Sequence, residues 1–122
     1  MDAAALVAYL DAEPGHDVVA AELAGSSVSA VNVAEVLGRA ARRGHDPGEI
    51  VRVLEGLGVR TEPFTEEDAL AVARFAPASR ALGLSLADRA CLALAARSKA
   101  VVLTADRALA RADLGVQVEL IR

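Results

Sequence analysis

Hydrophobic residues recur along the chain at intervals of three and four positions, and this spacing predicts amphipathic helices. At residues 31–43, for example, Val33 and Val36 fall on one side of a helix. At residues 85–99 the same spacing predicts that Leu86 and Leu94 face inward. Pro77 predicts a break or kink in the helical run around it. Helices are predicted at residues 4–10, 16–23, 31–43, 46–58, 65–83, 85–99 and 107–112.

Short apolar runs between these helices predict strands at residues 26–30, 59–64, 100–104 and 116–121. The run at 100–104 is almost wholly apolar, which is typical of a strand that is buried on both faces of a parallel sheet. Pro63 restricts the strand at 59–64 to an edge or to its own end. Strands that alternate with helices predict an α/β fold, here a three-layer α/β/α sandwich with a mainly parallel sheet.

The length of 122 residues, with 54% hydrophobic and 25% charged residues, predicts one globular domain over residues 1–122. The sequence contains no run of 18 apolar residues and no basic, apolar leader, so we expect neither a membrane span nor a signal peptide. The one cysteine, Cys91, lies on the apolar side of a predicted helix, and we expect it to be a core residue. A single cysteine cannot form a disulfide within the chain, and a cytoplasmic protein is the simplest expectation.

A formal net charge of −4 argues against binding nucleic acid by bulk electrostatic attraction. Basic residues nevertheless gather at Arg39, Arg42 and Arg43, where they suit a solvated helix end or a contact to an RNA backbone or a partner protein. Aromatic residues make up only 2% of the chain, so base stacking is not expected. Any nucleic-acid substrate would therefore be held through its backbone and its shape.

Four acidic residues lie at or just beyond the predicted strand ends: Asp2, Glu35, Asp88 and Asp106. Ligands of parallel α/β sheets bind beyond the carboxyl ends of the strands, so the topology brings these acids towards one edge. Converging carboxylates repel one another unless a cation neutralises them, and Mg²⁺ or Mn²⁺ suits an all-oxygen set. The residues therefore favour metal-assisted hydrolysis of phosphodiester bonds.

Each acid taken alone also has a purely structural interpretation. Asp88 follows Ser85 at the spacing of a capping box, and residues 65–68 have the same spacing without any other chemical signal. Asp106 is a plausible helix cap, and Asp2 is plausible as simple terminal charge. Glu35 lies four residues before Arg39, the favoured orientation for an exposed helix pair.

Four motifs occur in order along the chain: D-x-x-x-L at residues 2–6, S-x-x-N-x-x-E at 29–35, L-S-x-A-D at 84–88 and L-T-x-D at 103–106. Together they resemble the PIN-domain family, and most closely the VapC-like ribonuclease toxins of bacterial toxin–antitoxin pairs. The resemblance runs from Asp2 to the C-terminus. It implies a five-stranded parallel sheet and an Mg²⁺- or Mn²⁺-dependent endoribonuclease. It also implies a homodimer that a cognate antitoxin protein holds inactive.

The resemblance assigns roles to residues as well. Carried over by motif, the acidic metal-site and catalytic residues are Asp2, Glu35, Asp88 and Asp106, and the residues that orient them are Asn32, Thr104 and Ser85. Family members usually have several apolar residues ahead of the first aspartate, where they form the central strand. Only Met1 precedes Asp2 here, so we expect a truncated first strand and a charged terminal amine beside the acidic site. Either this start is short of the natural one, or catalysis is impaired.

Two other functions fit parts of the pattern. A PIN-like protein with impaired catalysis would serve as a binding or scaffold protein, and the short N-terminus favours this alternative. A receiver-like signalling module also gathers acids around Mg²⁺, but it needs a lysine just after the last-but-one strand. The one lysine of this chain, Lys99, comes before that strand. Neither a Gly-rich dinucleotide motif nor a P-loop is present.

Overall fold

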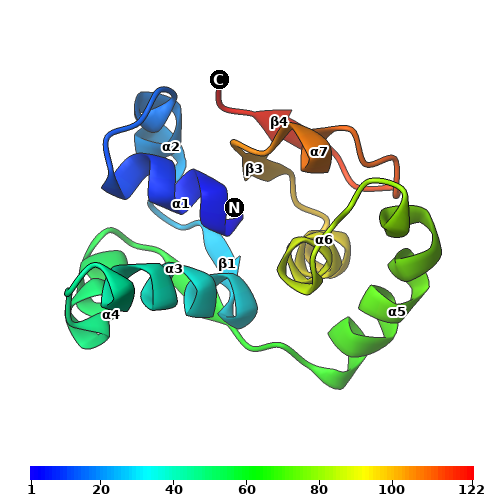
Figure 1. Cartoon of the computed structure of the whole chain (residues 1–122), viewed down its shortest axis with the longest axis horizontal. Coiled ribbons are helices and arrows are strands. Elements are labelled where there is room, and N and C mark those ends of the chain that lie inside the picture. Colours follow the sequence, from blue (N-terminus) through cyan, green and yellow to red (C-terminus); the bar gives the residue numbers. More distant parts are fainter.

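Helices and short strands alternate along the computed structural model, which describes residues 1–122 apart from the side chains of residues 78 and 79 (Figure 1). In chain order the elements are α1 (Ala3–Leu10), α2 (His16–Glu22), β1 (Ser27–Ser29), α3 (Ala30–Arg42), α4 (Pro47–Gly56), β2 (Arg60–Glu62), α5 (Glu66–Arg80), α6 (Leu86–Ser98), β3 (Val102–Thr104), α7 (Arg107–Ala110) and β4 (Val118–Leu120). This order confirms the predicted α/β alternation. None of the described helices is both long and apolar enough to span a bilayer.

The strands form two separate two-stranded parallel sheets, β1 with β2 and β3 with β4. Ser27 lies opposite Arg60 in the first sheet, and Val102 lies opposite Val118 in the second. The structure therefore does not show the predicted five-stranded sheet. Between the two sheets lie Met1 and Asp2, which form no strand of their own.

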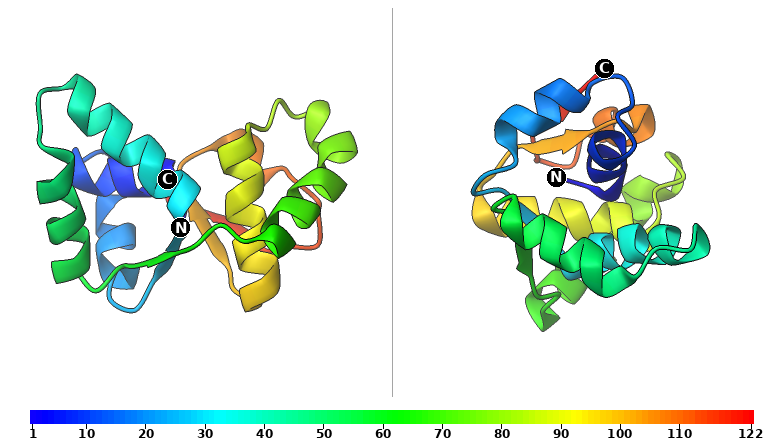
Figure 2. Two further views of the ribbon diagram at one scale, coloured as in Figure 1. Left: turned by 90° about the horizontal axis from the view of Figure 1, so that it is seen from below. Right: turned by 90° about the vertical axis from the view of Figure 1, so that its left-hand side faces the viewer.

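Met1 and Asp2 nevertheless contact both sheets. The Met1 amine donates to the Ser27 carbonyl at 3.1 Å, and the Asp2 amide donates to the Leu103 carbonyl at 3.2 Å. These bonds leave the predicted truncated first strand with one backbone hydrogen bond on each side. Figure 2 shows the result as two halves, one with α1–α4 and the other with α5–α7 (left panel).

The hydrophobic core has a cluster in each half. Leu6, Val19 and Val28 belong to the first cluster, and Leu92 and Leu109 to the second. Helix α6 is buried along most of its middle, with residues 87 and 90–95 shielded from solvent. It lies against both α5 and α3 and so connects the two halves of the molecule.

Three details differ from the sequence-based expectations. Leu86 is 54% exposed because it occupies the first position of α6, before the buried run begins. Val101, predicted to lie in a strand buried on both faces, is 44% exposed and precedes β3. Helix α5 continues through Pro77 to Arg80, so no break occurs there. Pro77 lies near the end of that helix, where few further backbone bonds depend on it.

Candidate metal site

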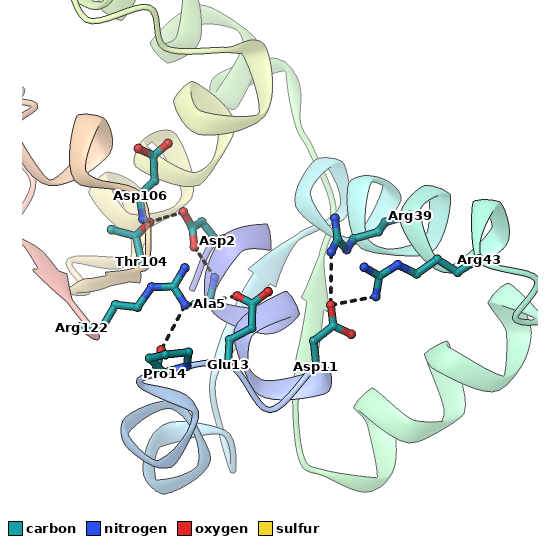
Figure 3. Close-up of polar contacts among 10 residues, drawn as sticks. All are labelled: Asp2, Ala5, Asp11, Glu13, Pro14, Arg39, Arg43, Thr104, Asp106 and Arg122. Atoms are coloured by element: carbon teal, nitrogen blue, oxygen red, sulfur yellow. Dashed lines mark hydrogen bonds and ion pairs between the residues drawn. The ribbon is translucent and has the colours of Figure 1, made fainter.

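Asp2 is the most enclosed of the four predicted metal-site acids, with 2% of its surface exposed. Its backbone is extended, with φ −94° and ψ 178°, which suits a residue that caps a helix. One carboxylate oxygen, Oδ1, accepts from the Ala5 amide at 2.9 Å and so caps α1. The other, Oδ2, accepts a hydrogen bond from the Thr104 hydroxyl (Figure 3). Asp2 is therefore held at both oxygens.

Thr104 is the last residue of β3 and is completely buried. Its hydroxyl oxygen also accepts from the Asp106 amide at 2.9 Å, so one side chain connects Asp2 to the turn that carries Asp106. Asp106 in turn caps α7, with Oδ1 accepting from the Ala108 amide at 2.8 Å. In Figure 3 the Asp106 carboxylate points away from Asp2 and Thr104. The predicted capping role of Asp106 is thus confirmed.

Asp88 forms the predicted capping box with Ser85 at the start of α6. Asp88 Oδ2 accepts from the Ser85 amide at 2.9 Å, and Ser85 Oγ accepts from the Asp88 amide at 3.1 Å. These reciprocal bonds fix the rotamer of the Asp88 side chain without occupying both of its carboxylate oxygens. Ser85 therefore orients Asp88, as Thr104 orients Asp2.

Glu35 and Asn32 lie one turn apart on α3. Asn32 is 1% exposed, and its amide nitrogen donates to the Ala87 carbonyl at 3.0 Å, which ties α3 to α6. Its other amide atom, Oδ1, is buried without a hydrogen-bond partner among the described residues. Glu35 is largely exposed, yet partial burial of its carboxyl and then the charge of Asp88 raise its pKa, while the Asn32 side chain lowers it.

The charge of Asp88 acts on two of the other predicted acids, Asp2 and Glu35. Burial raises the pKa of Asp2 to about 6, although its bonds to Thr104 and Ala5 and the charge of the Met1 amine oppose the rise. The charge of Asp88 adds to the rise, as it does at Glu35. Asp2, Glu35 and Asp88 come from three different elements, so the fold, and not chain proximity, brings their charges together. Asp106 is connected to this group through Thr104.

Four arginines form ion pairs in the described structure, and their partners are other acids. In the described part of the structure, ion pairs join Asp11 to Arg39 and Arg43, Asp68 to Arg97, and Glu13 to Arg122 (Figure 3 shows the first two and the last). The alternative interpretation of Glu35 as the helix partner of Arg39 is therefore wrong, because Arg39 Nη2 lies 3.3 Å from Asp11 Oδ2. None of the four predicted site acids takes part in these pairs.

These residues fit a hard divalent cation in their chemistry. All the donors are oxygens, the buried Asp2 carboxylate has no arginine partner among the described residues, and Asn32 Oδ1 is an acceptor in need of a partner. The acidic side chains lie too far apart to coordinate one ion together. In the described structure, no group of three or more His, Cys, Asp or Glu side chains is close enough to hold a metal. The acids would have to approach one another when an ion binds.

Two other ionisable groups, the Met1 amine and the Cys91 thiol, interact with these acids. The positive charge of the Met1 amine acts on Asp2 and lowers the pKa of its carboxyl. Cys91 is buried on α6, and burial raises the pKa of its thiol to about 12, with the charges of Asp2 and Asp88 acting in the same direction. A thiol held protonated in this way is a core residue and a poor nucleophile or metal ligand.

Comparison with known proteins agrees with the order of motifs in the sequence. The sequence model of the PIN domain matches residues 1–114. No curated protein and no solved structure matches the chain. PIN domains are generally metal-dependent nucleases and typically use divalent metal ions. With the match covering most of its length, the chain belongs to the PIN domain family.

Proposed function

We propose that this chain is an Mg²⁺- or Mn²⁺-dependent endoribonuclease that hydrolyses RNA phosphodiester bonds, and that it is the VapC-like toxin of a toxin–antitoxin pair in the cytoplasm. The observation that carries the proposal is the convergence of Asp2, Glu35 and Asp88, in which burial first, and then the charge of Asp88, raises the pKa of both Asp2 and Glu35. Such an arrangement is costly to a fold unless a cation offsets the repulsion. Membership of a family of generally metal-dependent nucleases supports the same reading.

In this proposal the ion is held by the carboxylates of Asp2, Glu35, Asp88 and Asp106. A bound divalent ion would lower the pKa of a water molecule and neutralise charge on the phosphate. The chain's own task is to position the ligands. Thr104 holds Asp2 by a hydrogen bond that favours its ionised form, and Ser85 fixes Asp88. Asn32 acts on Glu35 in the same sense, because it lowers the pKa of that carboxyl.

The partners follow from the same charges. The four acids have no arginine partner among the described residues, so their charge is left for a cation or for a basic side chain of another protein. An antitoxin arginine that enters this acidic site would inhibit by occupying the position of the ion. RNA would be held through its phosphate backbone, and we propose a homodimer on the strength of the resemblance to VapC-like toxins.

The test is cleavage of structured RNAs with Mg²⁺ or Mn²⁺ by the wild type and by Asp88→Asn. The asparagine keeps the cap on α6, because its side-chain oxygen still accepts from the Ser85 amide, but it lacks the charge that an ion needs. Asp46→Asn is a matched control, since Asp46 caps α4 on an exposed surface. Metal-dependent cleavage that only Asp88→Asn loses supports the proposal. Metal-dependent cleavage that Asp88→Asn retains contradicts the assigned site.

A second candidate is a PIN-like binding or scaffold protein with impaired catalysis. The observation that favours it is the spacing of the acids, since no three His, Cys, Asp or Glu side chains in the described structure are close enough to hold an ion. In that case the folded wild type would be inert on RNA with either ion. Calorimetric titration with Mn²⁺ separates the two candidates further, because an impaired site of this kind binds the ion weakly and Asp88→Asn changes little.

A further inference from the structure

Residues 69–112 have a charge opposite in sign to that of the whole chain. Their only acids are Asp88 and Asp106, both of the candidate metal site, and they contain seven Arg and Lys residues. The chain as a whole has a formal net charge of −4. These residues run from α5 to just past α7, through the half of the molecule on the right of Figure 2 (left panel). Positive charge is therefore concentrated in the half that holds these two acids.

Each of the two acids is followed directly by an arginine. Arg89 comes after Asp88 near the start of α6, and Arg107 comes after Asp106 at the start of α7. Neither arginine forms an ion pair with its neighbour, and neither has an acidic partner anywhere in the described structure. The acids therefore keep their charge for an ion, and the arginines keep theirs for another anion.

Arg89 is half-buried, and backbone carbonyls position its guanidinium group. Its Nε donates to the Ser85 carbonyl at 3.4 Å, and its Nη1 donates to the Val72 carbonyl of α5 at 3.4 Å. The amide and hydroxyl of Ser85 also form the capping box with Asp88. One residue thus anchors both the carboxylate and the guanidinium group. Carbonyl groups have no net charge, so these bonds leave the positive charge of Arg89 uncompensated.

Arg107 is exposed and occupies the first position of α7. Its backbone is held in place by its neighbour, because the Asp106 amide donates to the Thr104 hydroxyl and the Asp106 carboxylate caps the helix. The Arg107 side chain forms no hydrogen bond or ion pair with a described residue. It can therefore reach an anion that lies beside Asp106.

A phosphodiester strand is the anion that fits this arrangement. Arginine binds phosphate through two parallel N–H groups of its planar guanidinium group. A strand that crosses the acids brings one phosphate to the position of the ion and the adjacent phosphates to the flanking arginines. The regular repeat of the backbone thus supplies an anion to each arginine, which a single small anion cannot do.

We propose that Arg89 and Arg107 bind the phosphates on either side of the bond that is cleaved, so that the RNA crosses the α5–α7 half of the molecule past Asp88 and Asp106. The inference rests on the proposed function for its substrate, but not for the ion or for the cleavage step. Exposed charges act over about 8 Å at physiological ionic strength. Two arginines beside the site can therefore hold a strand that the net charge of the chain does not attract.

The test measures binding of a fluorescent single-stranded RNA of about 12 nucleotides by anisotropy, in EDTA so that the RNA stays intact. Arg89→Gln and Arg107→Gln each remove one positive charge and keep a side-chain N–H donor. Each should weaken binding by about three- to tenfold and lower the slope of log affinity against log salt by about 0.7. Arg52→Gln is the matched control and should change neither, because Arg52 is exposed on α4 without an acidic partner in the described structure.

Affinities of Arg89→Gln and Arg107→Gln equal to that of the wild type would overturn the proposal. An equal loss in Arg52→Gln would also overturn it, because binding would then depend on total charge alone. A wild type that binds no RNA has the same consequence. Arg107 is exposed, so Arg107→Gln decides the result if Arg89→Gln does not fold. Poly-glutamate that displaces the RNA as well as unlabelled RNA of equal charge does would assign the surface to an acidic protein instead.

RNA binding in EDTA and cleavage with Mg²⁺ or Mn²⁺ can fail separately. RNA that binds through the two arginines but is not cleaved by the wild type with either ion would support this surface and contradict the proposed nuclease. Metal-dependent cleavage by the wild type, together with unchanged RNA binding in both arginine variants, would support the nuclease and overturn the surface.

Discussion

The Thr104 hydroxyl donates a hydrogen bond to the Asp2 carboxylate, although the two residues are 102 positions apart in the chain. Both side chains are buried, and the bond fastens the end of β3 to the start of α1. The same hydroxyl oxygen accepts from the Asp106 amide. One small side chain thus orients one predicted metal ligand directly and the turn that carries another.

Thr104→Val should test this arrangement, because valine has the shape of threonine without its hydroxyl. Asp2 and the Asp106 amide would each lose a hydrogen bond in a buried place, which costs about 1–3 kcal/mol of stability. The pKa of Asp2 should rise further above about 6, since the lost bond favours the ionised form. Urea unfolding measures the first effect, and carboxyl carbon NMR against pH measures the second.

Thr104→Ser is the matched control, because serine keeps the hydroxyl and removes only a methyl group. It should retain the Asp2 pKa of the wild type and lose less stability than the valine variant. An Asp2 pKa that is the same in all three proteins would show that the hydroxyl does not act on this carboxylate.

The raised pKa of Asp2 predicts an unusual dependence of stability on pH. The folded state holds its proton up to about pH 6, whereas the unfolded chain releases it near 3.8, so the folded state binds more protons between these values. Stability of the metal-free protein should therefore fall as pH rises through this window, by up to about 3 kcal/mol. Unfolding in urea with EDTA, followed from pH 4 to 7, measures the change.

Asp2→Asn isolates this contribution, since the amide oxygen can still cap α1 but the residue no longer titrates. The part of the slope between pH 4 and 6 that belongs to Asp2 should vanish in the variant. Glu35 contributes in the same direction and is unchanged, so some slope should remain. Identical pH profiles for the two proteins would show that Asp2 does not titrate in this range.

Much of the fold was predictable because the residues that mark where helices and strands begin and end are close together in the sequence. Asp46 and Pro47 predict the start of α4, and the structure confirms it. Leu86 shows the limit, since a helical stripe does not reveal where burial along the helix begins. The five-stranded sheet that the resemblance implies is not shown by the structure. Its sequence signals for four strands are correct, but joining them depends on backbone bonds between distant segments, such as the bond from the Met1 amine to the Ser27 carbonyl, which no local pattern specifies.

The candidate site was predictable in part for the same reason. The capping box of Ser85 and Asp88 can be identified from four adjacent residues. The box of Thr65 and Asp68 has the same spacing and was predicted to have no other role, yet Asp68 also pairs with Arg97, 29 positions later. Spacing identifies the cap in both cases, but it contains no information about a partner that only the tertiary fold supplies.

The pair of Asp68 and Arg97 should stabilise the contact between α5 and α6. Asp68 is 3% exposed, and Arg97 contacts both of its oxygens, at 2.9 Å and 3.2 Å. Arg97→Met would leave that carboxylate buried without its cation, and we expect a loss of roughly 3 kcal/mol at pH 7. Asp68→Asn should cost less, because it removes the charge and can keep the cap with Thr65. Urea unfolding of both variants and of the double variant measures the difference.

The effect of pH on this pair has the opposite sign to that of Asp2. Burial alone would raise the pKa of Asp68, but the hydrogen bonds and charge of Arg97, with the bonds to Thr65, hold it below 3.8. The pair therefore contributes its full stability above that value and loses it as pH falls through the lower folded pKa. In Arg97→Met the deficit should shrink as Asp68 takes up a proton in acid. A deficit that is constant from pH 7 to 3 would mean that lost packing of Arg97 is its cause.

Asp106 and Asp46 offer a direct test of whether a helix-capping aspartate also binds metal. Each caps a helix through Oδ1 and the amide two residues further on, at 2.8 Å for Asp106 and 3.1 Å for Asp46. Asparagine caps about as well as aspartate, so both Asp106→Asn and Asp46→Asn should stay within about 0.5 kcal/mol of the wild type. Only Asp106→Asn should weaken Mn²⁺ binding, by at least about tenfold, because it removes one charged ligand. Calorimetric titration with Mn²⁺ after dialysis against EDTA measures both variants alike. Equal affinities in the two would leave Asp106 as a helix cap and remove it from the proposed site.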